Sequence, residues 1–205
     1  WRFNRTRLDA ELIRDSVLRA GGLLSPKIGG PSVYPPQPAS ITQEGVYGGK
    51  AWTESTGEDR YRRGLYTFAK RSAPYAMFNT FDGPSGEACI ARRDVSNTPL
   101  QALTLLNDTV ILEAAQALGR QLAAQPGSIE SRVENLFRRC LTRPPSADER
   151  SQLVKFFATQ RARFVSGELR AADFAGKGDV DANDRAAWTA LARALLNLDE
   201  MIAKG

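Results

Sequence analysis

Residues 98–124 have the sequence TPLQALTLLNDTVILEAAQALGRQLAA, which predicts a long apolar helix. Thr98 stands at the N-cap, Pro99 at the first helical position and Gln101 at the third, and this pattern is typical of a helix start. Pro126-Gly127 follows and favours an end near residue 124. The apolar side chains recur at helical spacing, so we expect this helix at the centre of the core: Leu103, Leu106, Val110, Leu112, Ala117 and Leu118.

Other segments also have helical periodicity. We expect helices over residues 129–141, from 147 to about 164 and from about 183 to 203, with a break at Pro144-Pro145. A first helix is predicted from about residue 6 to 20, ended by Gly21-Gly22. The fold class is therefore mainly α, a domain of at least four helices with its helical core at residues 98–205.

The segment between the first helix and this core has a different composition. Residues 21–60 hold 8 of the 17 glycines and 5 of the 11 prolines, which predicts a long irregular arm. Its aromatic residues Tyr34, Tyr47 and Trp52 are expected to pack it onto the helical body. Residues 64–70 alternate with a period of two and predict a short β element, followed by an aromatic run at 75–81 and a turn at 82–86.

The composition excludes several kinds of chemistry. The chain of 205 residues contains no histidine, which excludes His-based acid–base catalysis and metal sites that need imidazole. The two cysteines, Cys89 and Cys140, cannot by themselves complete a zinc site or an iron–sulfur cluster. We therefore expect no cofactor in this chain. Buried thiols are favoured over a bridge for Cys140, and the sequence leaves open whether the two are bridged.

The charge is basic but widely distributed. The net charge is +5, from 28 Lys+Arg against 23 Asp+Glu, and the arginines are spread from Arg2 to Arg193. A nucleic-acid-binding protein concentrates such charge on one face, so binding to nucleic acid is not favoured. No segment approaches the length of about 18 apolar residues that a membrane span requires.

One constellation of arginines, phenols and carboxylates surrounds the predicted turns. A sugar-like or anionic ligand is one interpretation, and a buried ion-pair network, which we favour, is the other. In the network, five arginines would pair with Asp82, Glu87, Asp94 and acids of the first helix. The candidate residues are Arg62, Arg63, Tyr66, Arg71, Tyr75, Asp82, Arg92 and Arg93.

Residues 179–184, DVDAND, are similar to the opening of a calcium loop. The sixth position of such a loop should be Gly and is Asp184, and the twelfth should be Glu and is Ala190. An acidic N-terminus of the last helix is the favoured interpretation, because the helix dipole stabilises acids there.

At several of these motifs the sequence resembles the PSD1 family, also called DUF1553. The resemblance covers nearly the whole chain, and residues 171–184 depart most from the pattern. It rests on Cys89 and on residues 4–15, 29–33, 62–66, 70–75, 81–84, 92–93, 97–108 (NTPLQALTLLND), 139–145 (RCLTRPP) and 194–197.

The resemblance implies architecture more than activity. The family is typical of large secreted or cell-surface proteins of planctomycetes, where it usually follows a DUF1549 domain, often with a c-type cytochrome domain upstream. It has no established activity. The chain would then be one domain, 1–205, of a larger extracytoplasmic protein, and it lacks the Cys-x-x-Cys-His motif that attaches haem.

Three functions remain as hypotheses. The first is a non-catalytic domain that packs against a DUF1549-type domain and positions a cytochrome-linked module. The second is a contribution to an oxidoreductase or carbohydrate-processing site that the neighbouring domain completes. The third is binding to nucleic acid.

Overall fold

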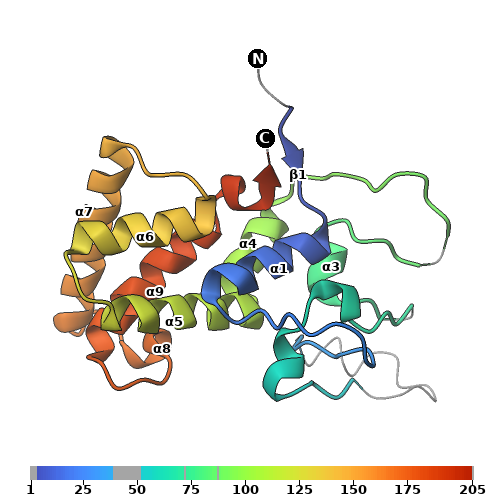
Figure 1. Ribbon diagram of the computed structural model, residues 1–205, viewed down its shortest axis with the longest axis horizontal. Helices are drawn as coiled ribbons and strands as arrows, with labels where there is room; N and C mark the ends of the chain where they lie inside the picture. Colours follow the sequence, from blue (N-terminus) through green and yellow to red (C-terminus); the bar gives the residue numbers. More distant parts are fainter. Residues whose placement is uncertain (1–3, 39–51, 72, 87, 205) are drawn as a thin grey trace.

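The computed structural model describes residues 4–38, 52–71, 73–86 and 88–204, and these residues form a mainly helical fold, as predicted (Figure 1). One end of the molecule is formed by α5 (Thr109–Ala124), α6 (Ile129–Leu141), α7 (Ala147–Val165), α8 (Ala172–Ala175) and α9 (Ala182–Leu196). The other end is formed by α1 (Ala10–Gly21), α3 (Ala76–Thr80) and the irregular segments. No helix in this described part of the chain is long and apolar enough to cross a membrane.

The predicted central helix is divided in two, so the expectation of one continuous helix is wrong. Helix α4 spans Pro99–Asn107 and α5 spans Thr109–Ala124. The break lies at Asp108, whose backbone is extended (ψ 135°) and whose side chain accepts hydrogen bonds from the N–H groups of Val110 and Ile111. Asp108 thus caps a new helix. The predicted capping box of Thr98 and Gln101 is confirmed.

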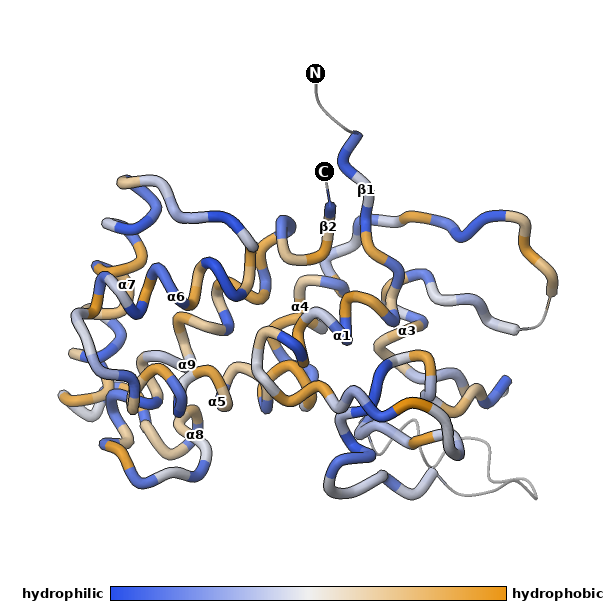
Figure 2. The backbone as a smooth tube through the Cα atoms, in the orientation of Figure 1, coloured by the Kyte–Doolittle hydropathy of each residue, from blue (hydrophilic) through white to orange (hydrophobic). Residues whose placement is uncertain are grey.

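Helix α5 and α9 (Ala182–Leu196) form the centre of the core. They pack closely at Gly119, where a Cβ atom would lie 2.9 Å from the carbonyl oxygen of Arg185 and 3.0 Å from the backbone nitrogen of Thr189. Trp188 of α9 is fully buried and packs on Phe157, with ring centroids 4.1 Å apart. Buried apolar residues of the peripheral helices, such as Leu136 and Phe137 of α6, belong to the same core. The hydropathy colouring shows hydrophobic and hydrophilic residues alternating along α6 (Figure 2).

The peripheral helices lie close to their predicted positions. Helix α6 spans Ile129–Leu141, the predicted bounds, and α7 spans Ala147–Val165 behind the capping box of Ser146 and Glu149. A short helix, α8 (Ala172–Ala175), precedes α9. Helix α9 ends at Leu196, earlier than predicted, and a 3-10 turn at Asp199–Ile202 and strand β2 (Ala203–Lys204) follow it.

The two ends of the described chain meet. Strand β1 (Thr6–Arg7) pairs antiparallel with β2, with Thr6 opposite Lys204 and Arg7 opposite Ala203. Helix α1 therefore begins at Ala10 rather than near Thr6, and it ends after Gly21 because Gly22 adopts a left-handed φ of 71°.

The predicted β element at residues 64–70 is wrong. Gly64–Tyr66 form a 3-10 turn, and only an isolated parallel bridge, Val33 with Thr67, follows it. A second such bridge joins Ser25 to Arg62. The aromatic run at 75–81 is helical instead, as α3 (Ala76–Thr80). The burial of residues 64–70 does not follow the alternation, since the three consecutive residues 66–68 are all half-buried.

The described parts of the predicted arm are irregular apart from a 3-10 helix at Gly57–Tyr61. Aromatic side chains pack these parts of the arm, as predicted for Tyr34 and Trp52. Trp52 is buried, donates a hydrogen bond of 2.8 Å to the carbonyl oxygen of Pro35, and contacts Tyr34 edge to face. The third, Tyr47, lies outside the described residues.

Candidate functional site

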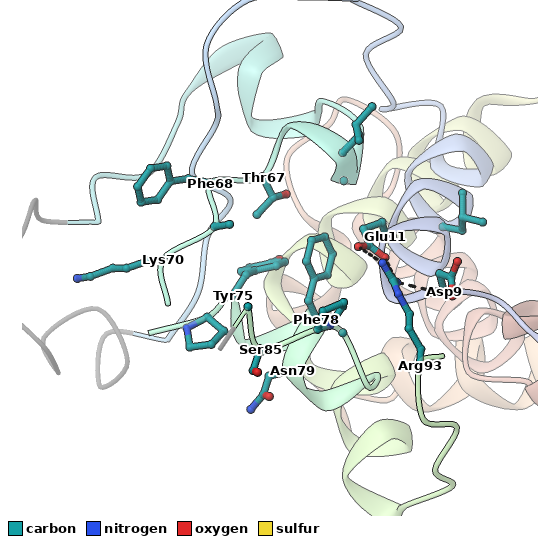
Figure 3. Close-up of a pocket in the computed structure, with 18 of the residues that line it drawn as sticks. Asp9, Glu11, Thr67, Phe68, Lys70, Tyr75, Phe78, Asn79, Ser85 and Arg93 are labelled. Atoms are coloured by element: carbon teal, nitrogen blue, oxygen red, sulfur yellow. Dashed lines mark hydrogen bonds and ion pairs between the residues drawn. The ribbon is translucent and has the colours of Figure 1, made fainter. Parts of the chain in front are cut away.

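A cleft with a volume of about 620 Å³ lies between the start of α1, residues 63–71, α3 and the turn at 83–86 (Figure 3). At its floor the backbone of Gly64 packs directly against α1. A Cβ atom on Gly64 would lie 2.9 Å from the Cα of Glu11. The carboxylate of Asp15 secures this approach by accepting a hydrogen bond of 2.6 Å from the Gly64 N–H.

One wall of the cleft is aromatic. Phe68, Tyr75 and Phe78 line it, together with Pro74 and Pro84. Tyr75 is buried and contacts Phe78 edge to face, with ring centroids 4.9 Å apart. Burial raises the pKa of the Tyr75 phenol well above its usual range, so this side chain stays neutral.

The other side of the cleft carries paired charges. Arg93 lies 2.7 Å from the Glu11 carboxylate and 3.6 Å from that of Asp9, and Arg63 lies 3.4 Å from that of Asp15. Partial burial by itself would raise the pKa of Glu11, but the hydrogen bonds from Arg93, a backbone hydrogen bond and the charge of Arg93 together outweigh it and hold this pKa below the ordinary value. Glu11 is therefore an ionised hydrogen-bond acceptor at neutral pH.

The structure brings only part of the predicted constellation to this cleft. The predicted site residues in its lining are Arg63, Arg71, Tyr75 and Arg93. The others lie elsewhere: Arg62, Tyr66, Asp82 and Arg92. Pairing of Arg63 and Arg93 with acids of the first helix is confirmed. No ion pair of Arg71, Arg92 or Asp94 occurs among the described residues, and Glu87 lies outside them.

Arg62 has a different role from the one expected. Its side chain is fully buried, and a carboxylate partner was predicted for it. Instead its guanidinium donates to the carbonyl oxygens of Pro31 (3.0 Å), Gly29 and Lys27 (3.5 Å), and it lies over the ring of Tyr66. Carbonyl oxygens take the place of the carboxylate, so Arg62 anchors the arm.

Asp82 also has a structural role. It adopts a positive φ of 60°, and its carboxylate accepts hydrogen bonds from the N–H of Ser96 (2.9 Å) and the hydroxyl of Ser96 (2.8 Å). Arg7 approaches the same carboxylate at 3.8 Å. These contacts join the turn after α3 to the segment that leads into α4.

Residues 1–157 match the sequence model of PSD1, a protein of unknown function (DUF1553). The chain belongs to the PSD1 family. No curated protein and no solved structure gives a significant match to it. The match to PSD1 ends inside α7, so the PSD1 region contains the cleft and α5, whereas α9, the main partner of α5, lies beyond it.

Most cleft residues were not among the candidate site residues, and Glu11, Phe68 and Phe78 are the ones that shape its two walls. Glu11 pairs with Arg93 from a distant segment. Arg14, one turn further along α1, is fully buried and donates to the carbonyl oxygens of Arg60 (2.9 Å) and Arg62. The period-two sequence pattern of residues 64–70 includes Phe68 and is the feature that could have indicated it as a site residue. The pattern was interpreted as a strand instead.

The two remaining sequence features have structural roles. Cys89 is exposed and Cys140 is buried, and both are free thiols. At the acidic segment, Asp181 caps α9 by accepting a hydrogen bond of 2.9 Å from the N–H of Asp184, whose own carboxylate pairs with Arg161. The favoured interpretation of this segment as an acidic helix start is confirmed.

Proposed function

We propose that this PSD1 chain is a non-catalytic interaction domain that packs against a DUF1549-type domain of a larger, extracytoplasmic, cytochrome-linked protein. The observation that carries the proposal is the exposed apolar face of α4. Leu100 and Leu103, three residues apart on one side of the helix, are both more than half exposed. The opposite side of α4 is buried through Gln101 and Leu105.

The segment before α4 extends this apolar surface. Its described residues, from 88 on, are mostly exposed, and they run through a loop that reaches away from the helical body (Figure 1). Ile90 and Val95 on this loop are also more than half exposed. Exposed apolar side chains gathered in one segment are typical of a protein–protein contact, and burying each leucine in an interface would stabilise it by roughly 1.5–3 kcal/mol.

The cleft carboxylates favour a non-catalytic role. A general acid needs a pKa raised toward neutral pH, whereas Arg93 lowers the pKa of Glu11. Asp15 is engaged by Arg63 and by the N–H of Gly64. The extracytoplasmic location and the cytochrome association rest on the family resemblance, and fractionation of cells that express the parent protein tests the location.

Binding to a purified DUF1549-type domain, measured by isothermal titration calorimetry, tests the proposed contact. Leu100→Gln with Leu103→Gln keeps good helix formers and removes the apolar face, so we expect a loss of affinity of at least about tenfold. Val165→Gln, at an exposed valine at the end of α7, is the matched control and should bind as the unmodified chain does. Equal affinity of all three proteins, or no binding by any, contradicts the proposal.

A further inference from the structure

The cleft beside α1 has one aromatic wall and one polar wall. It is a different surface from the exposed apolar face of α4. The aromatic wall belongs to a continuous series of ring contacts. Phe68 contacts Tyr34 at 4.9 Å between centroids, Tyr34 contacts Trp52 at 5.2 Å, Trp52 stacks on Tyr75 at 6.2 Å, and Tyr75 contacts Phe78 at 4.9 Å. The first and last rings, Phe68 and Phe78, are half-buried and line the cleft.

This series holds the wall rigid. Trp52 is fixed by its hydrogen bond to Pro35 and lies behind Tyr75, away from the cleft lining. The rings of Phe68 and Phe78 are therefore supported from behind, and a flat ligand meets a preformed surface. Preorganisation of this kind lowers the entropic cost of binding.

The polar wall offers hydrogen-bonding groups of both kinds. The Glu11 carboxylate accepts and the Arg93 guanidinium donates. The exposed amide of Asn79, which does both, lines the cleft on the other side of Phe78, beside Ser85. Figure 3 shows the Glu11–Arg93 pair on one side of Phe78, and Thr67 and Phe68 above Tyr75. The ammonium of Lys70 points away from these rings.

The charges of the cleft are nearly balanced. Its lining has three acids, Asp9, Glu11 and Asp15, and four bases, Arg63, Lys70, Arg71 and Arg93. Glu11 and Asp15 are already paired with arginines, and Lys70 turns outward. Of the four bases in the described lining, only Arg71 is therefore left to meet an anionic ligand. This near balance favours a neutral ligand that is rich in hydroxyl groups.

We propose that this cleft binds a sugar ring of a neutral oligosaccharide. A pyranose ring has an apolar C–H face, which matches the aromatic wall, and a polar rim of hydroxyl groups, which matches the Glu11–Arg93 pair on one side of Phe78 and Asn79 on the other. The C–H face packs on Phe78 and Phe68, and the hydroxyl groups bond to Glu11 and Arg93. The volume of about 620 Å³ lies within the range of roughly 300–1,000 Å³ that is usual for small-molecule sites.

Titration with neutral hexasaccharides of glucose, mannose and xylose tests the proposal. Trp52 fluorescence is one readout, because Trp52 stacks on Tyr75, and calorimetry is a second. We expect at least one neutral hexasaccharide to bind. Phe78→Ala and Glu11→Gln should each weaken it at least about tenfold, while Lys155→Ala, at an exposed lysine on α7, leaves affinity unchanged.

Asn79→Ala protects the test against unfolding, because Asn79 is exposed on α3 and its loss should weaken binding without lowering the melting temperature. No binding by any neutral sugar overturns the proposal. The proposal is also overturned if a hexauronate binds and no neutral hexasaccharide does. Sugar binding that Phe78→Ala and Asn79→Ala leave unchanged overturns it too, as does displacement of the sugar only by a leucine-rich peptide. The proposal is independent of the contact through α4, whose variants should bind sugar normally.

Discussion

The guanidinium of Arg62 lies 3.8 Å from the centroid of the Tyr66 ring, and both side chains hold the same stretch of the arm. Arg62 donates to the carbonyl oxygens of Gly29 and Pro31, and the Tyr66 hydroxyl accepts a hydrogen bond of 2.8 Å from the Gly29 N–H. A buried arginine is stabilised here by backbone dipoles and an aromatic face. The arm is thereby fixed next to the residues that form the cleft.

We predict that Arg62→Ala strongly destabilises the fold. Its removal takes the donor away from the carbonyl oxygens of Gly29 and Pro31 and creates a cavity where a fully buried side chain stood, at a cost of at least about 2 kcal/mol. Chemical denaturation measures this loss. Arg71→Ala is the control, because Arg71 is exposed, and it should change stability by less than about 0.5 kcal/mol. An equal effect of the two substitutions would show that Arg62 does not anchor the arm.

Gly119→Ala should destabilise the core in spite of the better helix propensity of alanine. The added methyl group would meet the backbone of α9 at Arg185 and Thr189, and the helices would have to separate. We expect a loss of about 1–3 kcal/mol. Ser151→Ala on the exposed side of α7 is the control and should be neutral or slightly stabilising. A stabilised Gly119→Ala variant would refute the close packing of α5 on α9.

The two cysteines should differ sharply in reactivity. Burial raises the pKa of the Cys140 thiol to about 12, so iodoacetamide at pH 8 should modify Cys89 and spare Cys140 in the native protein. Mass spectrometry of Cys89→Ser should then show no label until denaturant is added. The pKa of the Cys140 thiol is near 9 in the unfolded chain and about 12 in the folded one. Between these pH values only the unfolded state loses its proton, so the free energy of unfolding should fall as pH rises. Rapid native labelling of Cys140 would contradict its burial.

The ion pairs of Arg143 should make the stability of the fold depend on pH in the acid range. It lies 2.7 Å from both Glu149 and Glu200, and its hydrogen bond lowers the pKa of Glu149 to about 2. A lowered carboxyl pKa stabilises the fold above the unfolded value of 4.5, and this contribution is lost as pH falls toward 2.

Arg143→Ala should therefore melt at a modestly lower temperature at pH 7, and the difference from the unmodified chain should shrink between pH 4.5 and 2. Arg170→Ala, at a largely exposed and weakly paired arginine, is the control and should show no such convergence. A difference that is constant with pH would exclude the Glu149 contribution.

Most helices of this fold could be predicted from the sequence, because their caps are local signals. Ser146 with Glu149 and Thr98 with Gln101 each place a helix start within a few residues. The break at Asp108 could not be predicted, since the apolar pattern continues through it and the aspartate is also tolerated within a helix. The β1–β2 pair joins residues nearly 200 positions apart, and no local pattern indicates such a contact.

The candidate site could be predicted only in part. The pairing of Arg63 and Arg93 with acids of the first helix could be predicted, because that helix carries several carboxylates and a guanidinium pairs with a carboxylate in fixed geometry. The partners of Arg62 could not be predicted. Whether a buried arginine donates to a carboxylate or to backbone carbonyl oxygens depends on how the arm folds over it. The aromatic wall depends likewise on contacts between distant segments, such as Tyr34 with Phe68.

Hydrogen–deuterium exchange of the chain with and without a DUF1549-type domain tests the proposed role most directly. If α4 and the loop before it form the contact, exchange should slow across residues 88–107 and stay unchanged over α7. An unchanged rate over 88–107, with slower exchange elsewhere or nowhere, would contradict the proposal that PSD1 packs through this face.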